Sequence, residues 1–373
     1  MNSYRIPVLD LKKQDRPARP AILRAIRRVL DRQEYVQSAA TERFERAFGR
    51  WLGVREVVGV NSGTAALYLA LKAMGVGQGD EVITTPFSFT ATLEAIVHAG
   101  ARPVLVDIDP ATFCISPAGV DRALTRRTKV ILPVHLYGHP ADMDRLGAMA
   151  RKGKVQILED AAQAHGATWN GRKAGTFGRA AAFSFYPSKN LGAYGDAGAV
   201  VTDDPDLAER LRKLRNHGRT ARYAHDLVGY NERLDGVQAA VLLAKLPFLN
   251  RWVRQRRSQA HRYDLALKNL RMILPKVHTK ARHAYHLYVI RVRNRDSVAA
   301  ALRSHGIDSA VHYPVPLHLQ PCFKKLGYRR GDFPESELAA QSVLSLPLYP
   351  GLPKSHQARV VQVLSKLSES QNL

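Results

Sequence analysis

The chain has 373 residues, and its 56 Lys and Arg against 32 Asp and Glu give a formal net charge of +24. Hydrophobic residues make up 45% and charged residues 24%, a composition typical of globular proteins and unlike that of a largely disordered chain. The only cysteines, Cys114 and Cys322, exclude a disulfide scaffold and a cysteine-rich zinc site, and we expect no metal. The length predicts about two domains.

The N-terminal segment and the hydropathy pattern indicate where the protein acts. Residues 1–20 carry Arg, Lys and Asp throughout and lack the apolar core of a signal peptide. Elsewhere no stretch approaches the ~18 apolar residues of a membrane span. We therefore expect a cytoplasmic, soluble protein with no membrane partner.

The positive charge is unevenly distributed. Residues 251–303 contain 14 Lys and Arg and two acidic residues, a net +12 that is half of the total excess. This segment is either a solvated basic face or a surface for an anionic partner, such as a phosphorylated small molecule or nucleic acid. Because no helix-turn-helix or other nucleic-acid motif is present, we expect no nucleic-acid partner.

Short β-branched runs alternate with helical stretches in the first half of the chain. This alternation predicts an α/β fold, a mostly parallel sheet with helices on both faces, and a site beyond the carboxyl ends of the strands. The predicted strands are Val57–Val60, Val82–Thr84, Val104–Asp107, Val130–His135, Val155–Glu159, Ala181–Phe185 and Ala199–Thr202. The predicted helices between them are Ala65–Met74, Ala91–Ala99, Pro117–Leu124 and Asp142–Arg151.

The pattern changes after residue 206 to that of a smaller α+β unit. We predict an N-terminal arm over residues 1–15, a large domain over 16–247 and a small C-terminal domain over 248–373. The predicted elements are helices at Leu207–Asn216, Leu234–Leu246, Asn250–Leu270 and Val298–Ser304, and strands at Ala284–Val292 and near Ser309–Tyr313.

Two motifs near the start of the large domain point to a bound ligand. In VNSGTAAL a strand runs directly into a helix through small residues that include Gly63 and Thr64, an arrangement that exposes backbone N–H groups to an anion such as phosphate. An ordinary strand–turn–helix with Thr64 as its cap is the alternative. In TTPFSFTA, Phe87 and Phe89 could offer a flat face to a planar ligand, although core packing is the favoured reading for any single phenylalanine.

Two further motifs add a carboxylate and an amine. The strand before Asp160 is apolar, so a carboxylate at its end needs a cation or a strong donor, or else caps the next turn. Lys189 follows another strand among small residues, where a lysine of lowered pKa can form a Schiff base. A phosphate cradle, an aromatic platform, a buried carboxylate and a lysine in this order are what pyridoxal 5′-phosphate requires.

The motifs NSGTAAL, EDAAQAHGA, SFYPSKNLGAYGDAGAV, RNHG and GYNERLDGVQAA together resemble the DegT/DnrJ/StrS family of sugar-nucleotide aminotransferases. The resemblance extends from IPVLDLKKQ to HYPVPLHLQP and implies the fold-type-I architecture, with a large αβα domain and a smaller α+β domain. It implies a catalytic Lys189 bonded to the cofactor and an Asp160 paired with the ring nitrogen. The other cofactor contacts that it implies are Gly63, Thr64, Phe89, Gln163, Ser184 and Asn231.

The resemblance also implies partners and a reaction. Asn231 would reach the phosphate across the interface of a homodimer, with a cap of the helix from Leu234 as the alternative role. Substrate contacts would come from His312, Tyr313 and His318, with Arg233 and residues 216–218 as further candidates. L-Glutamate would leave the cofactor as pyridoxamine 5′-phosphate, and a nucleotide-linked keto sugar would then accept the amino group. The HYPVPLH motif favours amination at C-3 over C-4, with UDP and dTDP sugars both open.

Overall fold

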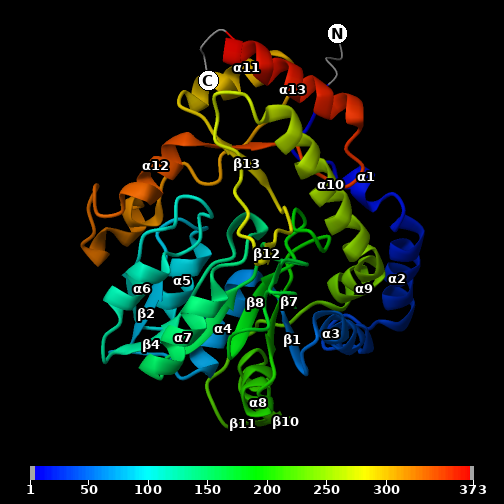
Figure 1. The fold of residues 1–373 in the computed structure, drawn as a ribbon. Helices are drawn as coiled ribbons and strands as arrows, with labels where there is room; N and C mark the ends of the chain where they lie inside the picture. Colours follow the sequence, from blue (N-terminus) through cyan, green and yellow to red (C-terminus); the bar gives the residue numbers. More distant parts are fainter. Residues whose placement is uncertain (1–4, 370–373) are drawn as a thin grey trace.

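A seven-stranded sheet forms the centre of the computed structural model, which describes residues 5–369 (Figure 1). The strand order is β1-β9-β8-β5-β4-β2-β3, and all neighbours are parallel except β9, which runs opposite to β1 and β8. Each strand coincides with a predicted one to within a few residues, and the mostly parallel α/β fold is confirmed. The strands are β1 Glu56–Val60, β2 Glu81–Thr84, β3 Arg102–Leu105, β4 Thr128–Ile131, β5 Gln156–Asp160, β8 Ala180–Ser184 and β9 Gly198–Thr202.

Helices bury both faces of this sheet, which explains why its strands are apolar on both sides. Val200 of β9 packs in the cluster that contains α4 and α8, whereas its neighbour Val201 packs in the cluster that contains α3 and α9. Side-chain oxygens cap several of these helices at their N-termini, including those of Ser62 at α4 and Asp204 at α8. The helices of this part are α1 Leu11–Asp15, α2 Arg19–Arg32, α3 Ala39–Leu52, α4 Gly63–Ala73, α5 Ala91–His98, α6 Pro117–Ala123, α7 Met143–Gly153, α8 Pro205–Leu214 and α9 Gly236–Lys245.

The C-terminal third packs above this sheet as a smaller α+β layer in Figure 1. Its core strands are β13 (Tyr288–Arg291) and β14 (Val343–Leu346), which pair antiparallel. The strand predicted near Ser309–Tyr313 is wrong: this segment meets the outer edge of β14 at a single bridge, from Ala310 to Ser345, and residues 311–313 do not continue the pairing. The helices are α10 Leu249–Leu267, α11 Arg295–Ser304, α12 Pro334–Ser342 and α13 Lys354–Glu369.

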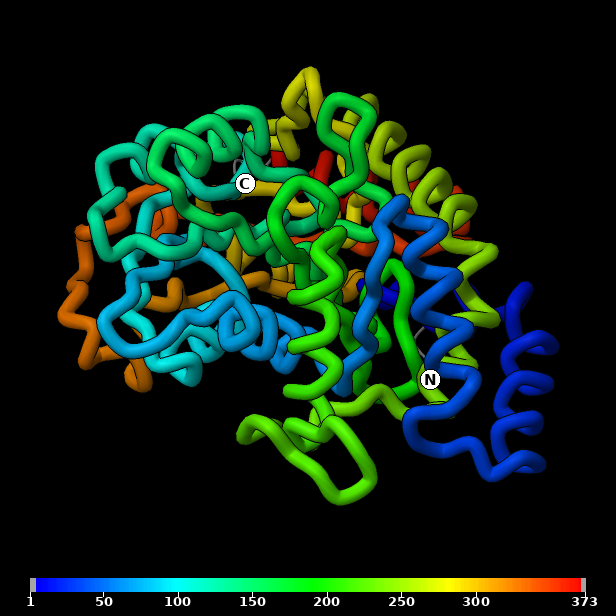
Figure 2. The backbone as a smooth tube through the Cα atoms, turned by 90° about the horizontal axis from the view of Figure 1, so that it is seen from below, coloured from blue at the N-terminus to red at the C-terminus, as the bar shows by residue number. Residues whose placement is uncertain are grey.

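Short elements connect the two parts. Strands β6 (Thr168–Trp169), β7 (Arg172–Lys173) and β12 (Ala281–Arg282) form a small sheet that joins residues from both halves of the chain. The hairpin of β10 (Arg219–Ala221) and β11 (Ala224–His225) projects from the molecule below α8, as Figure 2 shows. The domain division at residue 247, which falls between α9 and α10, stays a prediction.

Candidate active site

Asp160 ends β5 inside the protein, at the carboxyl edge of the sheet. Its Oδ2 accepts a hydrogen bond from Thr92 Oγ1 at 2.9 Å, and its Oδ1 accepts one from the backbone N–H of Ala162 at 3.2 Å. Burial raises the pKa of this carboxyl, while these two donors and the charge of Lys189 act in the opposite direction. A buried carboxylate with acceptor capacity left over is the partner that a protonated ring nitrogen needs.

Lys189 lies in the loop after β8. Its charge and that of Asp160 act on each other. Burial lowers the pKa of its amine to about 8, and the charge of Asp160 opposes that shift. Within residues 5–369, Nζ makes neither a hydrogen bond nor an ion pair. An amine of lowered pKa that the fold leaves unpartnered is suited to bond an aldehyde and to carry a proton.

The predicted phosphate cradle lies where α4 begins, between β1 and β8. The N-cap is Ser62, whose Oγ accepts from the N–H of Ala65 at 3.0 Å, so Thr64 does not cap this helix. A Cβ on Gly63 would lie 2.6 Å from Ser184 Cβ, so only glycine lets the helix start and β8 approach this closely. Gly63, Thr64 and Ser184 are therefore brought together at a helix N-terminus, as an anion site requires.

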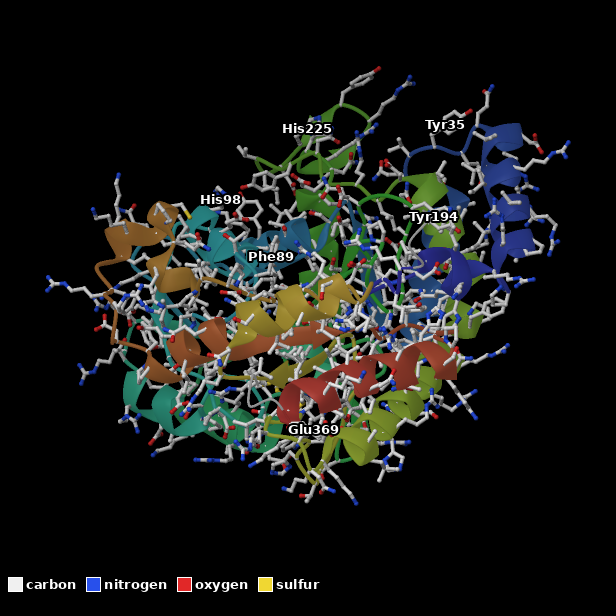
Figure 3. All side chains as sticks on the ribbon, turned by 90° about the horizontal axis from the view of Figure 1, so that it is seen from above. Tyr35, Phe89, His98, Tyr194, His225 and Glu369 are labelled. Atoms are coloured by element: carbon white, nitrogen blue, oxygen red, sulfur yellow. The ribbon has the colours of Figure 1, made fainter. Side chains whose placement is uncertain are left out.

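An aromatic ring and an amide line the same region. Phe89, labelled in Figure 3, is 54% exposed, whereas phenylalanine side chains are usually buried. Its ring centroid lies 5.9 Å from that of Tyr313. Gln163 Nε2 donates to the Tyr313 hydroxyl at 3.2 Å, while its Oε1 accepts from the N–H of Tyr137 at 2.6 Å. These contacts fix the amide and leave one ring face open to a flat ligand.

The predicted substrate residues divide into two groups. Tyr313 contacts Phe89 and Gln163. His312 lies near Lys189, and burial together with the charge of Lys189 lowers the pKa of His312 to about 4. His318 instead places Nε2 3.0 Å from Glu337 Oε1 and its ring edge against Phe333. The His318 imidazole therefore makes structural contacts with Glu337 and Phe333.

Asn231 and its neighbours lie at the base of the projecting hairpin. The backbone of Asn231 pairs with that of Asn216, and its side chain is exposed. Because α9 begins at Gly236 after Asp235, Asn231 does not cap this helix. Arg233 donates to Asn216 Oδ1 at 3.1 Å, so these candidates form one cluster.

Sequence reasoning did not identify the groups that support these residues. Thr92 lies three residues after Phe89, and its hydroxyl donates a hydrogen bond to Asp160. Glu159, directly before Asp160, is fully buried and serves the fold: it accepts three backbone N–H bonds from residues 175–178 and pairs with His135 at 2.8 Å. An acidic pair after an apolar strand signals that both carboxylates need partners, but not which one faces the site.

The basic segment 251–303 does not form one ligand surface. Arg256 is buried, and its guanidinium donates to the carbonyls of Tyr285, His286 and Leu348. Arg257 donates to the carbonyl of His283 at 2.8 Å. Some basic side chains of this segment therefore form hydrogen bonds within the protein. Others, such as Arg251 and Arg254 on α10, are exposed.

The described residues contain neither a membrane-spanning helix nor a group of metal ligands. No helix between residues 5 and 369 is long and apolar enough to cross a membrane. In the same part of the chain, no three His, Cys, Asp or Glu side chains are grouped so that they could hold a metal ion.

Buried neutral histidines predict that acid destabilises the protein. Burial lowers the pKa of His139 and His312 to about 4 and that of His165 to about 3, against about 6.5 in an unfolded chain. Between those values the unfolded state binds more protons, so each histidine removes about 1.4 kcal/mol of stability per pH unit as the pH falls. We expect the midpoint of thermal unfolding to drop from pH 7 to pH 5.

His165 allows a direct test of this expectation. Both ring nitrogens lack a partner, and the ring packs against Phe183 and Phe185. The variant His165→Phe should therefore unfold with a shallower pH dependence than the parent protein. An identical slope in both proteins would contradict the assignment of His165 as a buried neutral group.

Known proteins with similar sequences and structures include sugar aminotransferases. Residues 18–365 match the DegT/DnrJ/EryC1/StrS aminotransferase family. The chain is 44% identical to a dTDP-3-amino-3,4,6-trideoxy-alpha-D-glucose transaminase of Streptomyces venezuelae, over 98% of this chain and 97% of that one. It is 43% identical to a UDP-N-acetyl-3-dehydro-alpha-D-glucosamine 3-aminotransferase of Acidithiobacillus ferrooxidans, over 97% of each. A pleiotropic regulatory protein of Geobacillus stearothermophilus is 44% identical over 97% of this chain and 98% of its own.

Solved structures show the same fold and the cofactor. DesV of S. venezuelae, solved in complex with a ketimine intermediate, superimposes with a TM-score of 0.96 at 44% identity and covers 98% of this chain and 99% of its own. A putative sugar aminotransferase of Streptococcus pneumoniae, solved in its PLP form, gives a TM-score of 0.89 at 27% identity, over 94% of this chain and 96% of its own. The chain belongs to the DegT/DnrJ/EryC1/StrS family of pyridoxal-phosphate-dependent sugar aminotransferases.

Proposed function

We propose that this aminotransferase moves an amino group from L-glutamate to C-3 of a nucleotide-linked keto sugar and releases a 3-amino sugar nucleotide. The observation that carries the proposal is full-length similarity, at 43–44% identity, to proteins whose names specify C-3 amino or dehydro sugars. One carries dTDP and the other UDP, so the substrate is a dTDP-3-keto-6-deoxy sugar or a UDP-2-acetamido-3-keto sugar. A C-4 keto sugar is the alternative acceptor.

The residues present fit pyridoxal 5′-phosphate. When bound, this cofactor supplies an aldehyde that takes up the amino group and a ring that draws electrons from the reacting carbon. Asp160 would hold the proton on the ring nitrogen, and Phe89 would cover one ring face. Gln163 would contact the ring hydroxyl, since its position beside Tyr313 is already fixed. The N–H groups and hydroxyls of Gly63, Thr64 and Ser184 would receive the phosphate.

Lys189 would do the proton transfer. Its amine, with a pKa of about 8, is partly neutral near physiological pH and is able both to bond the aldehyde and to accept a proton from the reacting carbon. The same amine then returns the proton, and the donor half-reaction precedes the acceptor half-reaction. We therefore expect ping-pong kinetics with glutamate and the keto sugar.

We also propose a homodimer with composite sites, in which Asn231 of one protomer reaches the phosphate bound by the other. The exposed Asn231 side chain and the projection of the nearby hairpin, on which His225 is labelled in Figure 3, support this arrangement. His312 and Tyr313 would contact the sugar, and His318 would stabilise the loop that carries them. Arg233 and residues 216–218 would support Asn231.

Mixed dimers test the composite site. Lys189→Ala and Asn231→Ala are each expected to be impaired as homodimers, the second through weaker cofactor retention. If Asn231 acts across the interface, a heterodimer of the two variants contains one site with both residues intact and one with neither. Co-purified heterodimers should then recover up to about half of the parental rate. Recovery no greater than the sum of the two homodimers would place Asn231 outside the partner's site.

The substrate is identified by a reverse half-reaction. The purified cofactor-loaded enzyme is mixed with a UDP-linked and then a dTDP-linked 3-amino sugar, and the visible absorbance of the bound cofactor is followed. Loss of the band with one sugar alone identifies the nucleotide. No loss with either, while glutamate still bleaches the band, would retain the aminotransferase and refute C-3.

A regulator that binds nucleic acid on this fold is the second candidate, favoured by the net charge of +24. The internal bonds of Arg256 and Arg257 weaken it, because they remove part of the basic segment from the surface. A DNA-binding titration against salt separates the two: weak binding that disappears at modest salt indicates a non-specific surface.

A further inference from the structure

A buried ion pair joins the N-terminal helix α1 to the end of α9. Lys245 is 1% exposed and Asp15 is 6% exposed, and Lys245 Nζ lies 2.9 Å from Asp15 Oδ2. Neither residue belongs to the cofactor or substrate sites described above. Removing two charges from water is costly, and a buried ion pair is commonly no more stable than apolar residues of the same volume. Fold stability alone is therefore a weak reason for this pair.

The pair contacts the loop that carries Lys189. Lys245 Nζ also donates to the carbonyl of Gly192 at 2.8 Å, three residues after Lys189. The same ammonium lies 4.5 Å from the ring centroid of Tyr194. In Figure 3, Tyr194 lies on the side of the molecule where the blue N-terminal helices pack. One cation thus links α1, α9 and the Lys189 loop.

This loop is closed so tightly that a displacement at Gly192 reaches Lys189. A Cβ on Gly192 would lie 2.2 Å from the carbonyl oxygen of Pro187, so the two ends of the segment touch across Lys189. Two neutral amides hold the same loop elsewhere: Asn190 Nδ2 donates to Ala284 at 3.2 Å, and Gln238 Oε1 accepts from the N–H of Tyr194 at 2.8 Å. Lys245 supplies the charged bond, which is the stronger kind.

We propose that Lys245, oriented by Asp15, is a positioning residue that sets the place of the Lys189 amine through the carbonyl of Gly192. This inference rests on the proposed role of Lys189. Proton transfer and covalent capture require the reacting atoms within about 3–3.5 Å, and a misplacement of about 1 Å costs up to about 10²-fold in rate. A bond to the loop backbone controls that distance without touching cofactor or substrate.

The experiment compares Lys245→Met with the double variant Asp15→Leu/Lys245→Met. The single variant leaves a buried carboxylate unpaired, so it loses both stability and the bond to Gly192. The double variant removes both charges and should recover the thermal midpoint, yet it still lacks the bond. In both we expect kcat to fall about tenfold with KM for the donor changed by less than about twofold. If the single variant does not fold, the double variant alone tests the proposal.

A second readout does not depend on turnover. Apoprotein is mixed with pyridoxal 5′-phosphate, and the rate at which the cofactor becomes fixed to Lys189 is followed by borohydride trapping and peptide mass spectrometry. We expect both variants to be captured about tenfold more slowly than the parent protein. Parental kcat and capture rate in the double variant would overturn the proposal and leave the pair a structural role only.

Glu81→Gln is the matched control. Glu81 is a buried carboxylate 2.8 Å from Arg127, at the start of β2 and thus at the edge of the sheet opposite the site. This variant should lose stability while keeping the parental kcat and capture rate. If Lys189→Ala still fixes the cofactor, the proposed role of Lys189 fails independently of the result for Lys245.

Discussion

Replacing Lys189 by alanine is expected to abolish covalent capture of the cofactor and to lower kcat/KM by at least about 10⁴-fold. The reason is that one amine is assigned both the bond to the aldehyde and the proton transfer. Among the described residues no neighbouring group is suited to replace it, because burial holds the pKa values of the nearby imidazoles of His165, His286 and His312 below the ordinary range. Absorbance spectra and initial rates with glutamate measure both effects.

Lys173 provides the control for this variant. Burial also lowers the pKa of its amine, but the amine lies over the indole ring of Trp51 and donates to the Trp51 carbonyl. Lys173→Met should therefore leave cofactor capture and kcat/KM unchanged. Retained capture in Lys189→Ala, or its loss in Lys173→Met, would move the Schiff-base assignment to another lysine.

Asp160→Asn should reduce kcat by about 10²–10³-fold while the protein stays folded. Asparagine is isosteric: its Oδ1 can accept from the N–H of Ala162 and its amide N–H₂ can donate to the Thr92 hydroxyl, which then donates to Ser88. It carries no charge, however, to keep a proton on the ring nitrogen. Burial raises the pKa of Asp160, so in the cofactor-free protein its ionisation above the unfolded pKa of about 3.9 works against folding. We therefore expect the apoprotein variant to unfold at the parental temperature or higher.

The neighbouring carboxylate should behave in the opposite way. Glu159 is satisfied by the N–H groups of Gly175, Phe177 and Gly178 and by His135. Glu159→Gln places an amide N–H₂ where acceptors are needed, and it should cost about 2–4 kcal/mol of unfolding free energy. The variant that still folds should retain most of its kcat. Equal effects of the two substitutions on rate and on stability would refute this division of roles.

The sequence predicted the central sheet because its strands are buried on both faces and read as continuous apolar runs. Four of these runs, β1, β2, β5 and β8, end at or just before a candidate site residue, which is why the sequence points to Asp160 and Lys189. The C-terminal part was harder, since its strands are short. Residues 309–313 resemble a strand, but only Ala310 pairs with the outer edge of β14 (Val343–Leu346), so tertiary packing overrides the local β propensity.

Contacts between residues far apart in sequence were not predictable from motifs. Thr92, the partner of Asp160, lies on α5, and Asp15, the partner of Lys245, lies on α1, 230 residues earlier in the chain. The cap of α4 depends on backbone geometry that makes Ser62, not Thr64, the N-cap. The motif predicts a substrate contact for His318, whereas its hydrogen bond to Glu337 depends on how α12 packs.

Arg256 has a consequence for anyone who engineers this protein to be less basic. Its guanidinium reaches three backbone carbonyls at 3.0–3.3 Å, a task that the single point charge of a lysine ammonium cannot repeat and that an acidic residue would reverse. Lowering the isoelectric point from about 10.3 should therefore begin with the exposed Arg251, Arg254 and Lys268. Along one helix, formulation chemistry and folding thus depend on different arginines a few residues apart.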